Sequence, residues 1–564
     1  MYPPQTSFIP VTVALVRFVE TNGFSGLYPY WYLGTTPVKY LIGPVVPVVL
    51  VFLHKILPNF SLFDLSLWLV VACQLLFSLG WGVLAWRLSS QRKIGIIVGL
   101  ISLFAPWHWV SALGLGEVSA VVAQALTPWV LLGFSVQGLG SSTRLKLVPS
   151  LYTLVPSVLF ALLLLTNTTA AIPAVVGLVI LAVVGGNSGK LGKLRESDKS
   201  DNQKIRISGK SDSLTLRHSE YSESSGLKRA ILVILLGWAI STFWYGPGYW
   251  LTIFGAPSIG GKSAVSAFVN LINLLRGFVP VILAVVLVFW KIKQRGLYDK
   301  FVLAWLTIFG SLTLFRFMAD PDFWMDWTSW MGEVEVGIAL LIAGSSICHF
   351  EKAFGQFLSR TTNDSVDLTQ ASARHQVGGK FAPKFRLASS SFSKWLLSLL
   401  IITFIGSWAF AFVHRDFWMP RKSIEDTVEY KIAKWLEIRI RGSTPEGKDK
   451  ALGVEPLQGS TVFLSGTTAF WLNSLVDVVQ VRGGRDEVSK NAQWRGLNWQ
   501  LTQGESLDSA VALLKAQGVD FIVVHGDSSQ EYYHDFVDPE KFEKIPSFEK
   551  VYDKAGDVIY KLYK

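Results

Sequence analysis

Charge is scarce in this chain of 564 residues: Asp, Glu, Lys and Arg make up 16% of it, against about a quarter in ordinary soluble proteins. Half of the residues are apolar, and the mean hydropathy is +0.38. Disordered, collagen-like and coiled-coil chains are excluded, because each needs a polar or periodic composition that is missing here. Such a composition predicts a protein with many membrane-spanning helices.

Cysteine is rare as well. Cys73 and Cys348 both lie in apolar stretches, away from charged partners, so neither a disulfide nor a cysteine-based metal site is expected. The Walker loop, the dinucleotide fingerprint, the HExxH pair and the serine elbow do not occur in a strand-and-helix context that would make them credible. These absences argue against the common classes of soluble enzyme.

Long apolar runs are what the chain has instead. A helix needs about 20 apolar residues to cross the hydrocarbon layer, and Trp or Tyr near the ends of many such runs suits the headgroup region. We expect ten spanning helices, centred on residues 65–86, 94–113, 118–137, 148–166, 169–186, 229–250, 274–291, 299–316, 332–349 and 395–413.

The net charge of +11 comes from Lys and Arg in the loops between these runs, which indicates membrane topology and not a nucleic-acid partner. If ten helices span, the basic loops share the cytoplasmic side, including two long polar loops at 187–228 and 351–394 that we expect to be disordered. An eleventh run, 40–57, is short and holds two prolines, so it is predicted to lie in the interface.

The predicted fold is therefore an α-helical polytopic membrane protein, with about ten spanning helices and one interfacial helix, followed by an extracytoplasmic α/β domain. Residues 1–62 form an external first loop with the interfacial helix, residues 63–413 the transmembrane domain, and residues 414–564 the soluble domain. The protein is expected in the plasma membrane, with both its beginning and its C-terminal domain outside.

The first residues, MYPPQTSFIP, lack the basic start and apolar core of a signal peptide. No segment there would deliver the first loop across the membrane. Our hypothesis is that a first transmembrane helix has been lost upstream, through a misassigned start codon or a truncated sequence. An in-frame apolar stretch just upstream in the genomic DNA would confirm it.

The composition after residue 414 is that of a soluble domain. Helical spacing of apolar residues predicts helices at 424–440 and 506–517, the second capped by Ser506. Short apolar runs predict strands at 461–464, 478–482 and 520–525, and a turn near Ala555 and Gly556 predicts a C-terminal hairpin.

Ionisable residues on the predicted outer side are the candidates for function, because the bilayer tolerates few charges. Glu117 lies in the short connection GLGEVSA, where it could bind a metal, accept a proton, or simply cap the following helix. His108, in PWHW, is a candidate for binding substrate, with an interfacial position as the alternative. Glu20 is a further candidate in the first loop, and an exposed helix end would explain it equally well.

The segment 316–335 interleaves carboxylates with tryptophans. This composition suits a sugar, which stacks on the rings and donates hydroxyls to the carboxylates, or a divalent cation such as Mg²⁺ or Mn²⁺. An acidic external loop with an aromatic belt is the alternative. The candidates there are catalytic Asp320, Asp322 and Asp326, and substrate-binding Trp324 and Trp327.

Two cations on the same side could hold a lipid phosphate. Arg276 begins a predicted membrane helix, and Lys262 lies in the external loop before it. The alternative is that both side chains extend to the interface without a ligand.

The sequence also resembles a known family. The stretches that carry the resemblance are GLYPYWYLGTTPVKYLIGPVVP, LGWGVLAWRL, LFAPWHWVSALGLGEVSAVVAQALTPWVLL and LLLLTNTTAAI, together with VFLSGTTAFWLN, VVQVRGG, GVDFIVVHG and DVIYKLY near the end. They are similar to the polytopic GT-C glycosyltransferase superfamily, and within it to membrane proteins labelled 6-pyruvoyl-tetrahydropterin-synthase-related. The label implies no pterin chemistry here, because the chain has no Cys/His zinc site.

The resemblance implies transfer of a sugar from a polyprenyl-phosphate-linked donor to an acceptor at the outer membrane face. In this family an essential acid follows the first transmembrane helix. The chain has neither that helix nor an Asp in the matching stretch, which implies that this copy could be inactive as it stands. Glu117 matches a second acidic position of some members.

Two other functions stay open from the sequence. A transporter or flippase for a lipid-linked glycan would need charged or broken-helix features in mid-membrane, and these are sparse. A non-catalytic envelope scaffold that presents the C-terminal domain is the third possibility. Partners expected under the first hypothesis are the lipid bilayer and the polyprenyl-phosphate-linked sugar donor, with no nucleic acid.

Overall fold

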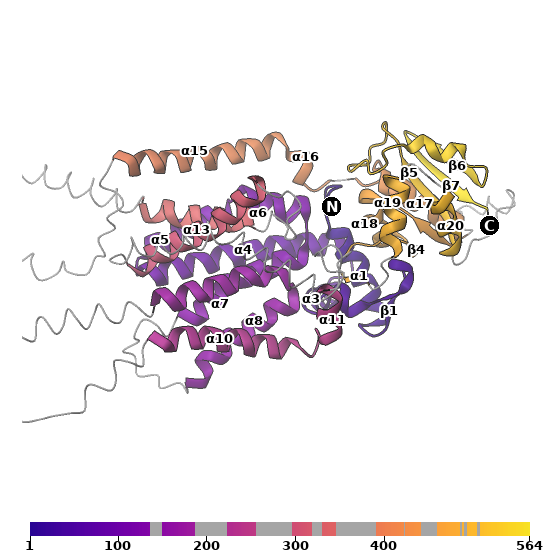
Figure 1. Ribbon diagram of the computed structural model, residues 1–564. Helices are drawn as coiled ribbons and strands as arrows, with labels where there is room; N and C mark the ends of the chain where they lie inside the picture. The colour runs from indigo at the N-terminus through magenta and orange to yellow at the C-terminus, as the bar shows by residue number, and fades with distance from the viewer. Residues whose placement is uncertain are drawn as a thin grey trace, which may run out of the picture.

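A computed structural model gives the arrangement of the chain. It describes residues 1–135, 149–185, 223–254, 296–318, 330–345, 391–421, 423–441, 460–485, 488–489, 493–504 and 508–563. A bundle of long helices forms one end, and an α/β domain forms the other, with the N-terminal segment between them (Figure 1).

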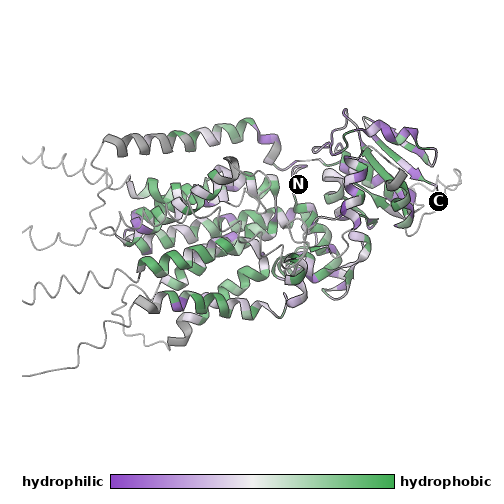
Figure 2. Cartoon of the chain, viewed as in Figure 1, coloured by the Kyte–Doolittle hydropathy of each residue, from purple (hydrophilic) through white to green (hydrophobic). Residues whose placement is uncertain are grey.

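Apolar helices make up the bundle, and hydrophobic residues predominate along their coloured parts (Figure 2). Consecutive helices pack side by side: α4 on α5 and α7, α7 on α8, and α8 on α10. The helices have the bounds α4 Leu62–Ser89, α5 Arg92–Leu103, α7 Val118–Ser135, α8 Pro149–Thr166, α10 Glu223–Ser241, α13 Leu297–Met318 and α15 Ser391–Val413, with two more at Thr169–Gly185 and 330–345.

Within the described residues, three helices are long and apolar enough to cross a bilayer: Leu62–Ser89, Val118–Ser135 and Leu297–Leu314. A bent pair, Arg92–Leu103 and Pro106–Leu115, would make a fourth. Several apolar helices thus support a membrane protein, but the number of about ten spans is not confirmed. The predicted helix at 274–291 lies outside the described residues.

Two of the predicted spans are broken. The run 94–113 bends by 43° between α5 and α6 (Pro106–Trp109), because Pro106 cannot donate a helical hydrogen bond and disfavours helix in the residue before it. A π-helical turn, η2 Val110–Leu115, follows. The run 229–250 is likewise divided into α10 and α11, Pro247–Phe254, with Gly246 and Pro247 at the break.

The first 62 residues hold more structure than the predicted external loop. A helix that the sequence analysis missed, α1 Ile9–Asn22, starts with Pro10 in its first turn and stops at Gly23, whose φ is 71°. After it come β1 Leu27–Tyr28, paired with β2 Thr36–Pro37, then α2 Val38–Leu41 and α3 Val45–Ile56. α3 corresponds to the run predicted at 40–57; its place in the interface stays a prediction.

The C-terminal part is a five-stranded sheet in the order β4-β3-β5-β7-β6. β3, β4 and β5 run parallel, and the hairpin β6–β7 is antiparallel to β5. This confirms the predicted strands and the turn at Ala555 and Gly556. The elements are α17 Val428–Arg441, β3 Thr461–Phe463, α18 Gly466–Leu475, β4 Val479–Gln480, α19 Gln493–Thr502, α20 Asp508–Ala516, β5 Val519–His525, β6 Phe548–Lys554 and β7 Asp557–Leu562.

Helix α17 begins at Val428, four residues later than predicted, where the backbone N–H of Tyr430 donates to the hydroxyl of Thr427. The proposed cap of the next predicted helix, Ser506, lies outside the described residues.

The α/β domain docks on the N-terminal segment through buried contacts. Helix α18 packs on α1, and the indole N–H of Trp31 donates to the side chain of Asn473 at 2.9 Å. Gly483 and Gly484 come so close to Trp31 and Val11 that a Cβ atom at either glycine would lie 2.6–2.7 Å from them. The segment after β4 is thereby placed at the end of the bundle where the N-terminal segment lies.

Candidate functional site

Glu117 lies at the start of α7, directly after Gly116, whose φ of +62° turns the chain out of the π-helical turn. Its carboxylate oxygen Oε1 accepts a hydrogen bond from Ser119 Oγ at 3.2 Å and one from Asn167 Nδ2 at 2.9 Å. Asn167 in turn accepts from the backbone N–H groups of Thr169 and Ala170, both at 3.0 Å. The carboxylate is therefore held in place from two different helical segments.

Arg485 reaches the same carboxylate from the α/β domain, 368 positions along the chain. Its Nη2 lies 3.2 Å from Glu117 Oε1, and its Nη1 donates to the carbonyl of Leu41 at 3.1 Å. The backbone N–H of Arg485 donates to the hydroxyl of Tyr32 at 2.9 Å, which fixes the main chain. The Arg485 side chain is 23% exposed and that of Glu117 is 42% exposed, so the pair is accessible to solvent on the carboxylate side.

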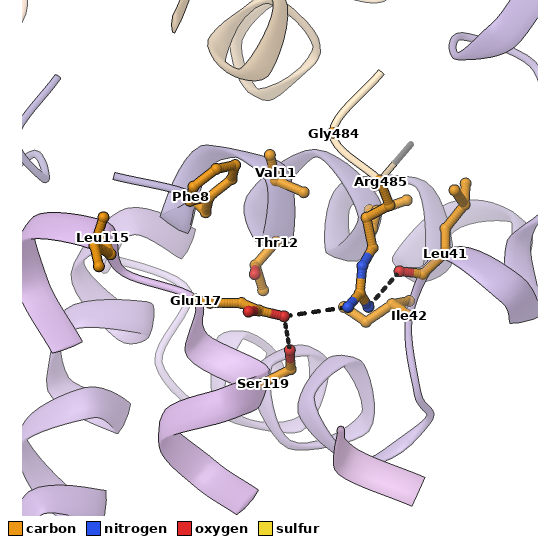
Figure 3. Close-up of a pocket in the computed structure, with 11 residues that line it drawn as sticks. Phe8, Val11, Thr12, Leu41, Ile42, Leu115, Glu117, Ser119, Gly484 and Arg485 are labelled. Carbon is orange, nitrogen blue, oxygen red and sulfur yellow. Dashed lines mark hydrogen bonds and ion pairs between the residues drawn. The ribbon is translucent and has the colours of Figure 1, made fainter. Parts of the chain in front are cut away.

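The ion pair stands in a pocket of about 210 Å³ at the junction of the bundle, α1 and the α/β domain. Apart from Glu117, Ser119, Arg485, Gly484 and Thr12, its walls are apolar (Figure 3). These apolar residues are Phe8, Val11, Leu15, Leu41, Ile42 and Leu115. A pocket with a few convergent polar groups in an apolar lining is the usual form of a site for an organic ligand.

His108 lies elsewhere, buried in the bundle. Its Nδ1 is 3.1 Å from Glu335 Oε2, and Glu335 also accepts from the backbone N–H groups of Trp107 and His108 at the start of α6. Gly332 packs directly on the imidazole. The predicted acidic segment and His108 do meet, but in a closed contact that joins helix 330–345 to the bend after α5. The structure does not bring His108 into the Glu117 pocket.

Glu20 contacts a histidine of a neighbouring helix. Its Oε1 lies 2.9 Å from His54 Nδ1, which joins the last turn of α1 to the last turn of α3. Glu20 follows the pocket residue Thr12 by eight positions, about 12 Å along the helix axis, so it does not line the pocket. This supports a structural role at the helix end.

The other candidates from the sequence lie outside the described residues: Lys262, Arg276, Asp320, Asp322, Trp324, Asp326 and Trp327. In the part of the chain that the structure describes, no group of three or more His, Cys, Asp or Glu side chains could hold a metal ion. Sequence analysis did not find Arg485 or Asn167, because nothing in their local sequence distinguishes them from other polar residues.

A second cluster of polar side chains, at the start of α18, is occupied by the domain itself. The backbone N–H groups of Gly466 and Thr467 donate to the carboxylates of Asp535 and Glu531, at 3.0 and 2.7 Å. A Cβ atom at Gly466 would lie 2.1 Å from Glu531. The helix N-terminus, which could attract a phosphate group in an α/β domain, is thus filled by the protein's own carboxylates.

The sequence matches no family model, and no curated protein matches it. Solved structures do resemble the fold. An oligosaccharyltransferase of Archaeoglobus fulgidus superimposes with a TM-score of 0.52 at 11% identity, over 93% of this chain and 66% of that one. The chain has a GT-C-like fold. It spans just under two-thirds of the length of that enzyme.

Two other glycosyltransferases score lower. ArnT from Cupriavidus metallidurans, bound to undecaprenyl phosphate, has a TM-score of 0.41 at 10% identity, over 99% of this chain and 93% of that one. The mycobacterial arabinofuranosyltransferase AftD has a TM-score of 0.41 at 14% identity, over 99% and 40%. At these identities the likeness concerns the fold alone, and it gives no support to the tetrahydropterin-synthase-related label.

Proposed function

We propose that the protein is a lipid-dependent glycosyltransferase, which moves a sugar from a polyprenyl-phosphate-linked donor to an acceptor at the outer membrane face. The observation that carries this proposal is the pocket at the junction, where a fixed carboxylate and an arginine stand in an apolar lining in a chain with a GT-C-like fold. A position at one end of the helical bundle suits a donor whose lipid tail stays in the membrane.

The chemistry assigned to the pocket follows from its residues. An acceptor hydroxyl or amine attacks the anomeric carbon of the sugar, and the bond between that carbon and the phosphate oxygen breaks. The acceptor's proton passes to the Glu117 carboxylate, which Ser119 and Asn167 orient. The phosphate leaves on its lipid with the electron pair of the broken bond, and the positive guanidinium of Arg485 offsets the charge that develops there.

The test is transfer by the purified full chain in lipid nanodiscs, with a panel of polyprenyl-phosphate-linked monosaccharides carrying a radiolabel. We expect release of the polyprenyl phosphate, and a fall of about 10²–10⁴-fold in that rate for Glu117→Gln, because removal of a general base costs about this much. The matched control is Glu437→Gln, which makes the same change on the surface of α17 beside Lys434. It should react as the wild type does.

The outcomes separate the proposal from its alternatives. If the label crosses the bilayer of vesicles without release of polyprenyl phosphate, the protein is a flippase and not a transferase. If no donor is cleaved or moved, the proposed function is wrong for this chain.

A further inference from the structure

Arg485 is the one cation that lines the described pocket, and at present it is paired with an internal anion. A guanidinium is planar and offers several N–H donors in a fork that fits two oxygens of a carboxylate or of a phosphate. The Glu117 carboxylate therefore occupies the position that an anionic ligand would take. Any such ligand must compete with Glu117 for the same cation.

The lining of the pocket indicates which anion would compete. Apolar side chains from α1, from the segment around α2 and from the turn before α7 surround the ion pair. A free anion would lose part of its hydration shell against these apolar walls, which costs free energy. An anion joined to a hydrocarbon chain would bury that chain against the same walls, and this burial of apolar surface is favourable. The chemistry that fits both features is a phosphate on a lipid.

The main chain at Arg485 is fixed while its side chain spans the gap. Its backbone N–H is tied to Tyr32, and the two glycines before it are wedged against Trp31 and Val11. A change of partner therefore needs rotation of the side chain alone, with the α/β domain docked as it is.

We propose that Arg485, delivered by the α/β domain, binds the phosphate of the lipid carrier, and that its ion pair with Glu117 is a lock which the carrier opens. Arrival of the phosphate draws the guanidinium away from Glu117, and the carboxylate is thereby released from its ion pair. Carrier binding thus prepares the carboxylate to accept a proton. The inference rests on the proposed function for the role of Glu117, but the binding step does not require that any sugar is transferred.

The experiment measures binding of farnesyl phosphate to the full chain in detergent micelles by isothermal titration calorimetry, with no sugar present. Farnesol and inorganic phosphate are the comparison ligands. We expect farnesyl phosphate to bind and the other two to bind far more weakly. Equal binding of inorganic phosphate would show a free-anion site, and equal binding of farnesol would show an apolar pocket without phosphate recognition; either result overturns the proposal.

Three variants test the direction in which the affinity for farnesyl phosphate changes. Arg485→Gln should weaken farnesyl phosphate binding at least tenfold, whereas Glu117→Gln should tighten it, because the competing carboxylate is gone. Both variants break the same ion pair, so a merely structural effect of losing it would move them in the same direction. The matched control is Arg482→Gln, three residues earlier in the same segment and paired with Asp535 outside the pocket, which should bind as the wild type does.

The results also keep this inference apart from the proposed function. Binding that depends on Arg485 in a protein that cleaves no donor would leave the phosphate site standing and remove the transferase. The opposite result is transfer by a protein whose Arg485→Gln variant binds farnesyl phosphate normally, or whose Glu117→Gln variant binds it no more tightly. That result would keep the transferase and remove the proposed phosphate lock.

Discussion

Thr467 lies between two buried carboxyl groups of the α/β domain. Its hydroxyl oxygen is 2.5 Å from Glu429 Oε1 and 3.0 Å from Glu531 Oε1. One hydroxyl carries one proton, so it can donate to only one of these groups and must accept from the other. Glu531 already accepts hydrogen bonds from the backbone N–H groups of Thr467, Tyr533 and His534, so both of its oxygens act as acceptors. The proton therefore belongs on Glu429, whose pKa burial raises above the ordinary value.

This arrangement predicts a pH dependence of the domain's stability. A carboxyl group with a raised pKa binds its proton more tightly in the folded chain than in the unfolded chain. Its contribution to the free energy of unfolding is therefore complete below the ordinary pKa of 4.5, and it is lost as the pH rises through the raised pKa. Glu429→Gln cannot ionise and keeps a donor for Thr467. We expect it to flatten the decline of stability above pH 4.5, measured as the urea midpoint by pulse proteolysis. An equal slope in the wild type and the variant would show that Glu429 carries no such proton; Glu437→Gln is the surface control.

Among the elements, the turn that joins the π-helical segment to α7 leaves little room for change. Gly116 has a φ of +62°, and a Cβ atom there would lie 2.0 Å from Ser7 Oγ and 2.9 Å from Ile9 at the start of α1. Gly116→Ala should therefore cost about 1–3 kcal/mol in backbone strain alone, with the clash added to it. It should also displace α1 from the pocket, so transfer should fall together with the melting temperature.

The control for this prediction is Gly310→Ala in α13, where a Cβ atom would meet no atom within 4 Å. Alanine is the better helix former, by about 1 kcal/mol, so this variant should melt no lower than the wild type. If Gly116→Ala melts at the same temperature as Gly310→Ala, the turn adjusts freely and does not fix Glu117.

How far the sequence predicted these elements depends on the range of the interactions that form them. The strand at 520–525 and the hairpin turn at Ala555 and Gly556 follow from local pattern, and both are confirmed. Helix α1 was missed because its 14 residues are too few for a span and show no amphipathic pattern that stands out. The pairing of Glu117 with Arg485 joins positions 368 residues apart, and only the docking of the two parts creates it. Glu117 was found as a candidate because a charge in an apolar sequence is conspicuous, whereas a charge in a polar domain is not.

At the scale of the whole molecule, the pocket can work only if the N-terminal segment and the α/β domain face the same side of the membrane. They are joined by direct bonds: the backbones of Tyr2 and Arg421 pair, and Gln5 donates to the carbonyl of Gln530 at 2.9 Å. Helix α4 runs from this end of the bundle to Ser89 at the other, as Figure 1 shows. The positive charge of the loops predicts that the junction is the outer end.

Cysteine labelling tests this orientation in intact cells that produce the full chain with Cys73 and Cys348 replaced by alanine. Ser25→Cys in the first segment and Ser528→Cys in the α/β domain, both exposed, should react with a membrane-impermeant maleimide. Ser90→Cys, exposed after the far end of α4, should react only once the cells are permeabilised. The reverse pattern would place the pocket in the cytoplasm, where a donor exposed on the outer leaflet could not reach Glu117.

A third outcome would contradict the docking itself: labelling of Ser25→Cys and Ser528→Cys from opposite sides of the membrane. The hydrogen bonds between Gln5 and Gln530 and between Tyr2 and Arg421 could not form across a bilayer.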